Sequence, residues 1–178
     1  MRIYKNKLTL MNKIKRFLWN LVWQIFIRPL PRNTGRIWVL FLLRLFGAKV
    51  HRTANVYSSV KIYAPWNLVM QEHSCLAPEV DCYNVDKVFI GSYSTVSQKT
   101  YLCSASHDVT KSSNPLITAP IIIENQVWIG ANVFLGMGVT INTGAVVGAT
   151  SSVYKDIEAW TIVGGNPAKF IKKRLIND

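Results

Sequence analysis

The chain has 178 residues, of which 49% are hydrophobic and 17% are charged, a composition that supports a sizeable core and excludes global disorder. This length predicts one domain, or one domain with an accessory segment. The formal net charge is +12, yet residues 1–52 hold twelve Lys or Arg and no acid, whereas the nine Lys or Arg that follow are balanced by nine acids. The basic excess therefore lies on an N-terminal arm, which carries no groove-reading motif of a nucleic-acid-binding protein.

The arm, residues 1–48, contains two apolar runs at residues 17–30 and 37–46, each interrupted by polar or basic side chains. Neither reaches the roughly 20 uninterrupted apolar residues that span a bilayer, and no signal-peptide cleavage pattern follows the first run. We predict two helices separated by the breaker segment 28–35, with Gly47 ending the second. The aromatic and basic side chains of the arm fit packing against the protein or another subunit, and they also fit peripheral contact with a membrane.

Cysteine usage bears on metals and on the compartment. The three cysteines, Cys75, Cys82 and Cys103, form no Cys-x-x-Cys pair. An odd number without paired spacing predicts neither a disulfide framework nor a structural zinc site. We expect buried thiols, no required metal and a cytoplasmic protein, with a peripheral position at the inner face of the membrane left open.

A six-residue period governs the chain from about residue 50 onward. An aliphatic residue stands at every sixth position from Ile117 to Val153, and the same period recurs earlier in residues 50–80 and 90–102. Six residues make one short strand and a turn, so three repeats close a triangular coil whose aliphatic side chains point inward. We predict an all-β solenoid.

The solenoid is expected to have definite limits. We predict repeats over residues 49–160, with a frame slip near residues 80–90 and a loop ejected from the coil at residues 107–116. After Val153 the period decays into residues 161–178, which are rich in turn residues and Lys. For this last segment we predict a capping turn and a short basic helix that closes the end of the solenoid.

His107 is the candidate catalytic residue. It closes a repeat stretch where the loop is ejected, so its side chain could stand at the exposed edge of a coil. A neutral imidazole, with an ordinary pKa of about 6.5, can remove a hydroxyl proton during acyl transfer. His51 and His73 have no such context, and no second His follows His107 in its loop, which argues against a three-histidine zinc site.

Several segments resemble a known family, the hexapeptide-repeat acyltransferases, and within it the WcaF-like colanic acid biosynthesis acetyltransferases. The resemblance covers about residues 36–174. It rests on VSQKTYLCSASHD, PIIIENQVWIGANV, VWIGANVFLGMGVTINTGAVVGATSSVYKDI and IVGGNPAKFIKKR. It implies a left-handed parallel β-helix, a homotrimer, acetyl-CoA as the acyl donor, and His107 as the general base.

Candidate substrate-binding residues lie around His107 and in the last repeats. Asp81 and Asn84 lie in the first frame slip and could reach an acceptor sugar or the imidazole, or simply form a turn. Asp108 could orient His107 or start the loop. Trp128 is expected to project outward, where its indole could stack on pantetheine or sugar.

The resemblance also implies residues for acetyl-CoA. Backbone groups near Ala131 and Ala149 would hold the pantetheine. Four further side chains would lie near the phosphates, although a solvated basic tail explains the lysines among them equally well: Tyr154, Lys155, Lys169 and Lys172.

The expected activity is O-acetylation of a sugar hydroxyl of a surface or exopolysaccharide, or of its lipid-linked precursor. N-acetylation of an amino sugar and acetylation of a small molecule use the same base and fold, so both stay open. A non-catalytic β-helix scaffold or binding module is the alternative from another class.

Overall fold

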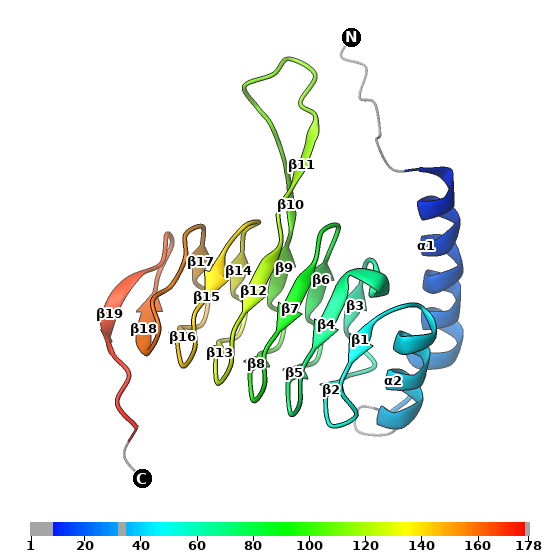
Figure 1. Cartoon of the computed structure of the whole chain (residues 1–178), viewed down its shortest axis with the longest axis horizontal. Coiled ribbons are helices and arrows are strands. Elements are labelled where there is room, and N and C mark those ends of the chain that lie inside the picture. The colour runs from blue at the N-terminus through cyan, green and yellow to red at the C-terminus, as the bar shows by residue number, and fades with distance from the viewer. Residues whose placement is uncertain (1–8, 32–34, 177–178) are drawn as a thin grey trace.

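The N-terminal arm folds into helices at one end of a β-solenoid (Figure 1). The computed structural model describes residues 9–31 and 35–176. Both predicted helices are confirmed, although the first begins before residue 17, where the Thr9 side chain accepts a hydrogen bond from the Asn12 amide. Neither helix in the described part of the chain has the length and hydropathy of a membrane span. Within its described residues the arm contains α1 (Leu10–Val22), a π-helical turn (Trp23–Ile27) and α2 (Arg36–Leu45).

Three sheets form the walls of the solenoid, where each of the first five coils adds one strand to each sheet and β18 and β19 then extend sheet B (Figure 1). Sheet A contains β1 (Lys49–Val50), β4 (Leu68–Met70), β7 (Val88–Ile90), β12 (Ile121–Ile123) and β15 (Thr140–Ile141). Sheet B contains β2 (Asn55–Val56), β5 (Cys75–Leu76), β8 (Thr95–Val96), β13 (Trp128–Ile129), β16 (Val146–Val147), β18 (Thr161–Gly164) and β19 (Lys169–Lys173). Sheet C contains β3 (Lys61–Ile62), β6 (Asp81–Tyr83), β9 (Tyr101–Cys103), β14 (Phe134–Leu135) and β17 (Ser152–Val153).

Two residues of each hexapeptide fill the interior. One is an aliphatic residue on the strand, such as Ile129 or Leu135, and both of these are fully buried. The other is the corner residue four positions later, such as Val133 or Val139, and each of these is 1% exposed. Because parallel strands stack about 4.8 Å apart, equivalent side chains of successive coils touch and form continuous apolar columns. The predicted solenoid and its inward frame are thus confirmed in the later coils.

The early coils are longer than the repeat predicts. Val50 pairs with Met70, and Met70 pairs with Ile90, so each of these coils has 20 residues rather than the 18 of three hexapeptides. The predicted slip near residues 80–90 is present, because Met70 pairs with Ile90, and a further slip that was not predicted lies at a 3-10 turn over Pro65–Asn67. As a result Ser74, which the sequence frame places on a strand, occupies a buried corner.

The predicted C-terminal helix is wrong. Strand β19 instead pairs antiparallel with β18, from Gly164 opposite Lys169 to Thr161 opposite Lys173. The last strand of sheet B would otherwise expose unpaired backbone groups, and β19 satisfies them. Its lysines then lie along the new outer edge, where charge opposes edge-to-edge aggregation.

Trp19 anchors α1 to the solenoid. Its side chain is fully buried, its Nε1 donates to the Ile62 carbonyl oxygen at 2.7 Å, and its ring lies 4.9 Å from that of Trp23 and 5.1 Å from that of Phe46. We expect Trp19→Ala to lower the free energy of unfolding by about 3–5 kcal/mol, because it opens a cavity and leaves a buried carbonyl unpaired. Urea denaturation measures this. In the matched Leu18→Ala variant, whose side chain is half-exposed, the loss should stay below about 1 kcal/mol, and equal losses would contradict the anchoring role.

Candidate active site

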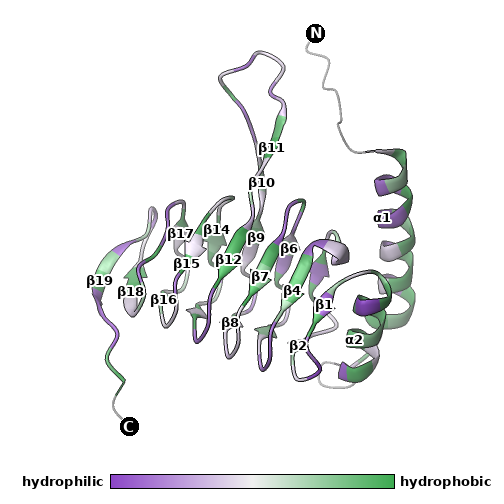
Figure 2. Ribbon diagram, in the orientation of Figure 1, coloured by the Kyte–Doolittle hydropathy of each residue, from purple (hydrophilic) through white to green (hydrophobic). Residues whose placement is uncertain are grey.

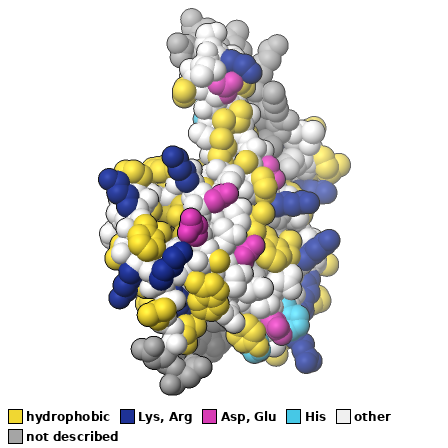
Figure 3. All heavy atoms as spheres, turned by 60° about the vertical axis from the view of Figure 1, so that its left-hand side comes forward, with side chains coloured by type: hydrophobic (Ala, Val, Ile, Leu, Met, Phe, Trp, Pro, Cys, Tyr) yellow, Lys and Arg dark blue, Asp and Glu magenta, His cyan; other side chains and the backbone are white. Residues whose placement is uncertain are grey.

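His107 lies on a hairpin that leaves the solenoid at the corner between sheets C and A. Strands β10 (Ala105–His107) and β11 (Leu116–Thr118) pair antiparallel, with His107 opposite Leu116. Figure 3 shows this hairpin standing clear of the solenoid body. The loop predicted to be ejected at residues 107–116 is therefore present, and a short β-ladder supports its base.

The environment of the His107 ring fixes its tautomer. The side chain is exposed, and its Nδ1 lies 2.7 Å from the backbone oxygen of Asn114 across the hairpin. A carbonyl oxygen only accepts hydrogen bonds, so Nδ1 is the donor and carries the proton of the neutral ring. The lone pair of a general base is then on Nε2.

Asp108 organises the loop. Its Oδ1 accepts hydrogen bonds from the Thr110 amide at 3.1 Å and from the Thr110 hydroxyl at 2.6 Å, and its Oδ2 lies 3.3 Å from Lys111 Nζ. The Thr110 hydroxyl, with further contributions from Lys111, lowers the pKa of the Asp108 carboxyl. Of the two roles predicted for Asp108, these contacts support the start of the loop, while the carbonyl of Asn114 holds the imidazole.

The two polar residues of the frame slip near residues 80–90 have different environments. Asn84 is fully buried, where its Oδ1 accepts from the Ala64 amide at 2.9 Å and its Nδ2 donates to the Ala64 carbonyl at 2.6 Å. The prediction that Asn84 reaches a substrate is therefore wrong, because its amide joins two coils inside the solenoid. Asp81 is 44% exposed on the outer face of sheet C, 3.7 Å from Lys61 Nζ.

The residues expected to contact pantetheine gather at a different corner of the triangular coil, between sheets B and C. Trp128 points outward from β13, as predicted, with 55% of its surface exposed and its Nε1 donating to the Ser97 hydroxyl at 3.0 Å. Ala131 and Ala149 lie in the turns that lead from sheet B to sheet C in two successive coils. The Thr150 amide donates to the Ala131 carbonyl at 2.8 Å, so the two turns are neighbours.

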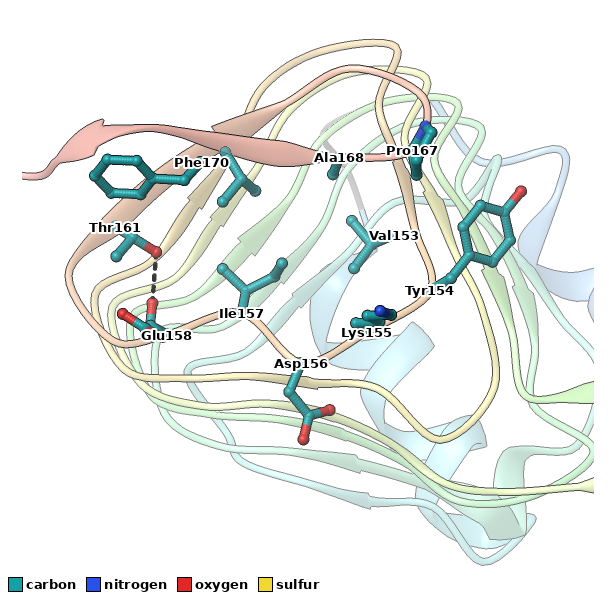
Figure 4. Close-up of a pocket in the computed structure, with 11 residues that line it drawn as sticks. Val153, Tyr154, Lys155, Asp156, Ile157, Glu158, Thr161, Pro167, Ala168 and Phe170 are labelled. Atoms are coloured by element: carbon teal, nitrogen blue, oxygen red, sulfur yellow. Dashed lines mark hydrogen bonds between the residues drawn. The ribbon is translucent and has the colours of Figure 1, made fainter.

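The residues expected near the phosphates gather at the C-terminal end. A cleft of about 430 Å³ opens there between β17 and the β18–β19 hairpin (Figure 4). Tyr154 and Lys155 line this cleft together with apolar side chains such as Ile157. Lys169 and Lys172 are exposed on β19. Within the described residues, no cluster of three His, Cys, Asp or Glu side chains is placed to hold a metal ion.

One chain does not bring the candidate base and the candidate pantetheine contacts together. His107 leaves from the edge of sheet C that adjoins sheet A, whereas Ala131 and Ala149 lie at the edge that adjoins sheet B. The width of sheet C separates the two groups.

An aromatic column on the outer face of sheet C was missed by the sequence analysis. Its successive ring centroids lie 4.7, 6.3, 5.7 and 5.6 Å apart, so the rings form a ladder across all five coils. Burial within the ladder, together with Cys103, raises the pKa of the Tyr101 phenol. One aromatic residue per coil on the same sheet was the signal in the sequence. The column consists of Tyr63, Tyr83, Tyr101, Phe134 and Tyr154.

No protein-family model matches the chain. The colanic acid biosynthesis acetyltransferase WcaF of Escherichia coli K12 is 40% identical over 164 residues, which cover 92% of this chain and 90% of that protein. A chloramphenicol acetyltransferase of Agrobacterium fabrum is 49% identical over 57 residues, but these cover 32% of this chain and 27% of that protein. Of these two, WcaF is the one that matches along nearly the whole length of both chains.

Solved structures share the fold. A hexapeptide-repeat acetyltransferase of Vibrio cholerae has a TM-score of 0.82 at 26% identity and covers 93% of both chains. A second structure of that protein, in complex with acetyl-CoA, has a TM-score of 0.79 at 24% identity and covers 98% of this chain and 95% of its own. A maltose O-acetyltransferase of Clostridium difficile 630 has a TM-score of 0.84 at 24% identity and covers 94% of this chain and 90% of its own. The fold is a left-handed parallel β-helix, as predicted.

The hexapeptide period, the β-helix and the full-length relative agree. Identity of 40% over 92% of the chain extends through the helical arm and the solenoid together. The predicted acyltransferase class is thereby confirmed. The chain belongs to the WcaF family of hexapeptide-repeat acetyltransferases.

Proposed function

We propose that the protein transfers acetyl from acetyl-CoA to a sugar hydroxyl of a surface or exopolysaccharide, or of its lipid-linked precursor. The observation that carries this proposal is the 2.7 Å contact between His107 Nδ1 and the Asn114 carbonyl, because it makes Nε2 the basic nitrogen on an exposed hairpin. The name of the 40% identical relative, a colanic acid biosynthesis acetyltransferase, supports a polysaccharide as the acceptor.

In the proposed reaction His107 first accepts a proton from the acceptor hydroxyl and then donates it to the leaving CoA sulfur. Nε2 removes the proton from the acceptor hydroxyl as its oxygen bonds to the thioester carbonyl carbon. The carbonyl of Asn114 keeps the ring oriented and stabilises the imidazolium that forms, since it accepts a hydrogen bond from Nδ1. When the tetrahedral intermediate collapses, the carbon–sulfur bond breaks and the imidazolium returns the proton to the CoA sulfur. The products are an acetyl ester and free CoA.

The proposed site lies between copies of a homotrimer. The separation of His107 from Ala131 and Ala149 across sheet C supports this assembly, because a neighbouring copy can bring its B–C corner to the hairpin. The aromatic column on sheet C supports it as well. Tyr154 is 59% and Tyr101 36% exposed in the single chain, and contact between copies would cover such rings.

Other side chains complete the proposal. Trp128 would stack on pantetheine or on the sugar beside the turns of Ala131 and Ala149. Asp81 and Asp108 remain candidates for contact with the acceptor. We assign the phosphates of acetyl-CoA to the C-terminal end of the solenoid, where a cationic site would suit them, and to these residues: Tyr154, Lys155, Lys169 and Lys172.

Release of free CoA from acetyl-CoA tests the function against nucleotide sugars, lipid-linked glycans, simple glycosides and amino sugars. We expect release with a glycan or glycoside that lacks a free amine, and a product that hydroxylamine cleaves, because it attacks an ester but leaves an amide. A product resistant to hydroxylamine would assign N-acetylation instead. No release with any acceptor, from folded protein that binds acetyl-CoA, would favour the scaffold alternative and contradict the proposal.

A further inference from the structure

Helix α1 has two apolar faces, and the solenoid covers one of them. On the inner face Trp19 is fully buried, and Trp23, the first residue of the π-helical turn that follows, is 4% exposed. On the opposite face Ile14, Phe17 and Leu21 recur at helical spacing and are 44%, 67% and 47% exposed. An ordinary surface helix carries polar side chains on its outer face. The outer face of α1 therefore exposes to water apolar side chains that are suited to an apolar environment.

Helix α2 extends this apolar face. Its outward residues Ile37, Phe41 and Leu45 are 80%, 50% and 67% exposed. The Trp38 ring stacks on Phe41 at 5.6 Å, and its Nε1 donates to the Phe26 carbonyl at 3.3 Å, which joins α2 to the turn after α1. Figure 2 shows hydrophobic residues along both helices at this end of the solenoid. We call the six outward residues the end-cap surface: Ile14, Phe17, Leu21, Ile37, Phe41 and Leu45.

The charges around the end-cap surface have one sign. At 100° per residue, Lys13 falls beside the apolar stripe of α1, and it is exposed. Lys15 lies nearer the inner face, with its Nζ 5.9 Å from the centre of the Trp66 ring of the solenoid. Arg28 is exposed where the π-helical turn ends. The first acid in the sequence is Glu72, beyond both helices. An apolar stripe bordered by cations is the pattern of a helix that lies in the interface of an anionic membrane.

We propose that the end-cap surface docks on the anionic leaflet of a membrane, with its apolar side chains at the acyl boundary and Lys13 and Arg28 at lipid phosphates. A second copy docked face to face would instead bring cations against cations, with no acid in residues 1–71 to pair with them. A lipid leaflet supplies both the apolar phase and the negative charge. Since neither helix is long enough to span a bilayer, the contact is peripheral.

Docking at this end would orient the enzyme. The end-cap surface lies at the N-terminal end of the solenoid, and the β18–β19 hairpin lies at the other (Figure 1). The His107 hairpin would then project from the side of a solenoid that stands on the membrane. The proposal concerns binding alone and does not depend on the acyl acceptor.

Co-flotation of the full chain with vesicles tests the proposal, without acetyl-CoA or acceptor. We expect binding to phosphatidylcholine vesicles that contain phosphatidylglycerol, little binding to phosphatidylcholine alone, and weaker binding at high salt. Phe17→Glu and Leu21→Glu should each lower the bound fraction about tenfold or more, since each places a charge at the acyl boundary. Lys13→Glu should also weaken binding. The matched control is Leu175→Glu, at a site 83% exposed outside the end-cap surface, and it should bind as wild type does.

Three results would overturn the proposal. One is undiminished vesicle binding by both Phe17→Glu and Leu21→Glu with circular dichroism unchanged. Another is equal binding to neutral and anionic vesicles. The third is a fall in oligomeric mass in these variants without loss of vesicle binding, which would assign the end-cap surface to a second copy. Acetyl transfer to a soluble acceptor is measured separately, so failure of the proposed activity would not be mistaken for failure of membrane docking.

Discussion

Replacing His107 with Ala should lower kcat for acetyl transfer by about 10²- to 10⁴-fold, the usual contribution of a positioned general base. The side chain is exposed on a hairpin, so its removal leaves the buried columns of the solenoid intact. We therefore expect unchanged circular dichroism and an unchanged affinity for acetyl-CoA. Steady-state kinetics of CoA release measures the loss.

Two further variants separate base catalysis from loop structure. His107→Asn places an amide donor where Nδ1 now meets the Asn114 carbonyl, but it supplies no base, so its activity should be as low as that of His107→Ala. His51→Ala removes an exposed imidazole that contacts Thr53, and it should keep full activity. Restored activity in His107→Asn would show that the histidine only holds the loop. A loss below about tenfold in His107→Ala would reject it as the base.

The repeat predicted the solenoid because each hexapeptide buries an aliphatic side chain at a fixed position. It could not place the early frame slip, since corner residues are buried too. Leu68, Ser74 and Val80 continue a six-residue series from Ile62 and are fully buried, yet Ser74 and Val80 are corner residues. Burial alone does not distinguish the series of strand residues from the series of corner residues. The coil length of 20 residues becomes visible only when Val50 is paired with Met70.

The C-terminal helix was predicted wrongly for a similar reason. Residues 169–174 have the composition of a basic helix, but an unpaired strand edge lies beside them in the folded chain, and pairing with β18 satisfies their backbone. For the site, the sequence predicted His107 at a loop junction, whereas its tautomer depends on Asn114, seven residues away across the hairpin. Which edge of sheet C holds each candidate residue could be read only after every strand had been assigned to a sheet.

The second large effect that we predict is loss of activity when the proposed pantetheine contacts, on a site shared between copies, are blocked. Ala149 is exposed in a turn at the B–C corner, so Ala149→Trp should fold normally and block the contacts proposed there for pantetheine. We expect this variant to lose nearly all activity, as His107→Ala does. If the base and the B–C corner of each site come from different copies, the two inactive variants complement each other. A trimer that combines the two variants then contains one seam at which an intact His107 faces an intact B–C corner.

The measurement that tests this account most directly is the activity of mixed trimers, made by coexpression of His107→Ala and Ala149→Trp with two different affinity tags and purified through both. One intact seam in three predicts about a third of wild-type activity. Two differently tagged copies of His107→Ala, purified in the same way, should stay inactive. Mixed trimers no more active than this control would contradict an acetyl-transfer site built between copies of the chain.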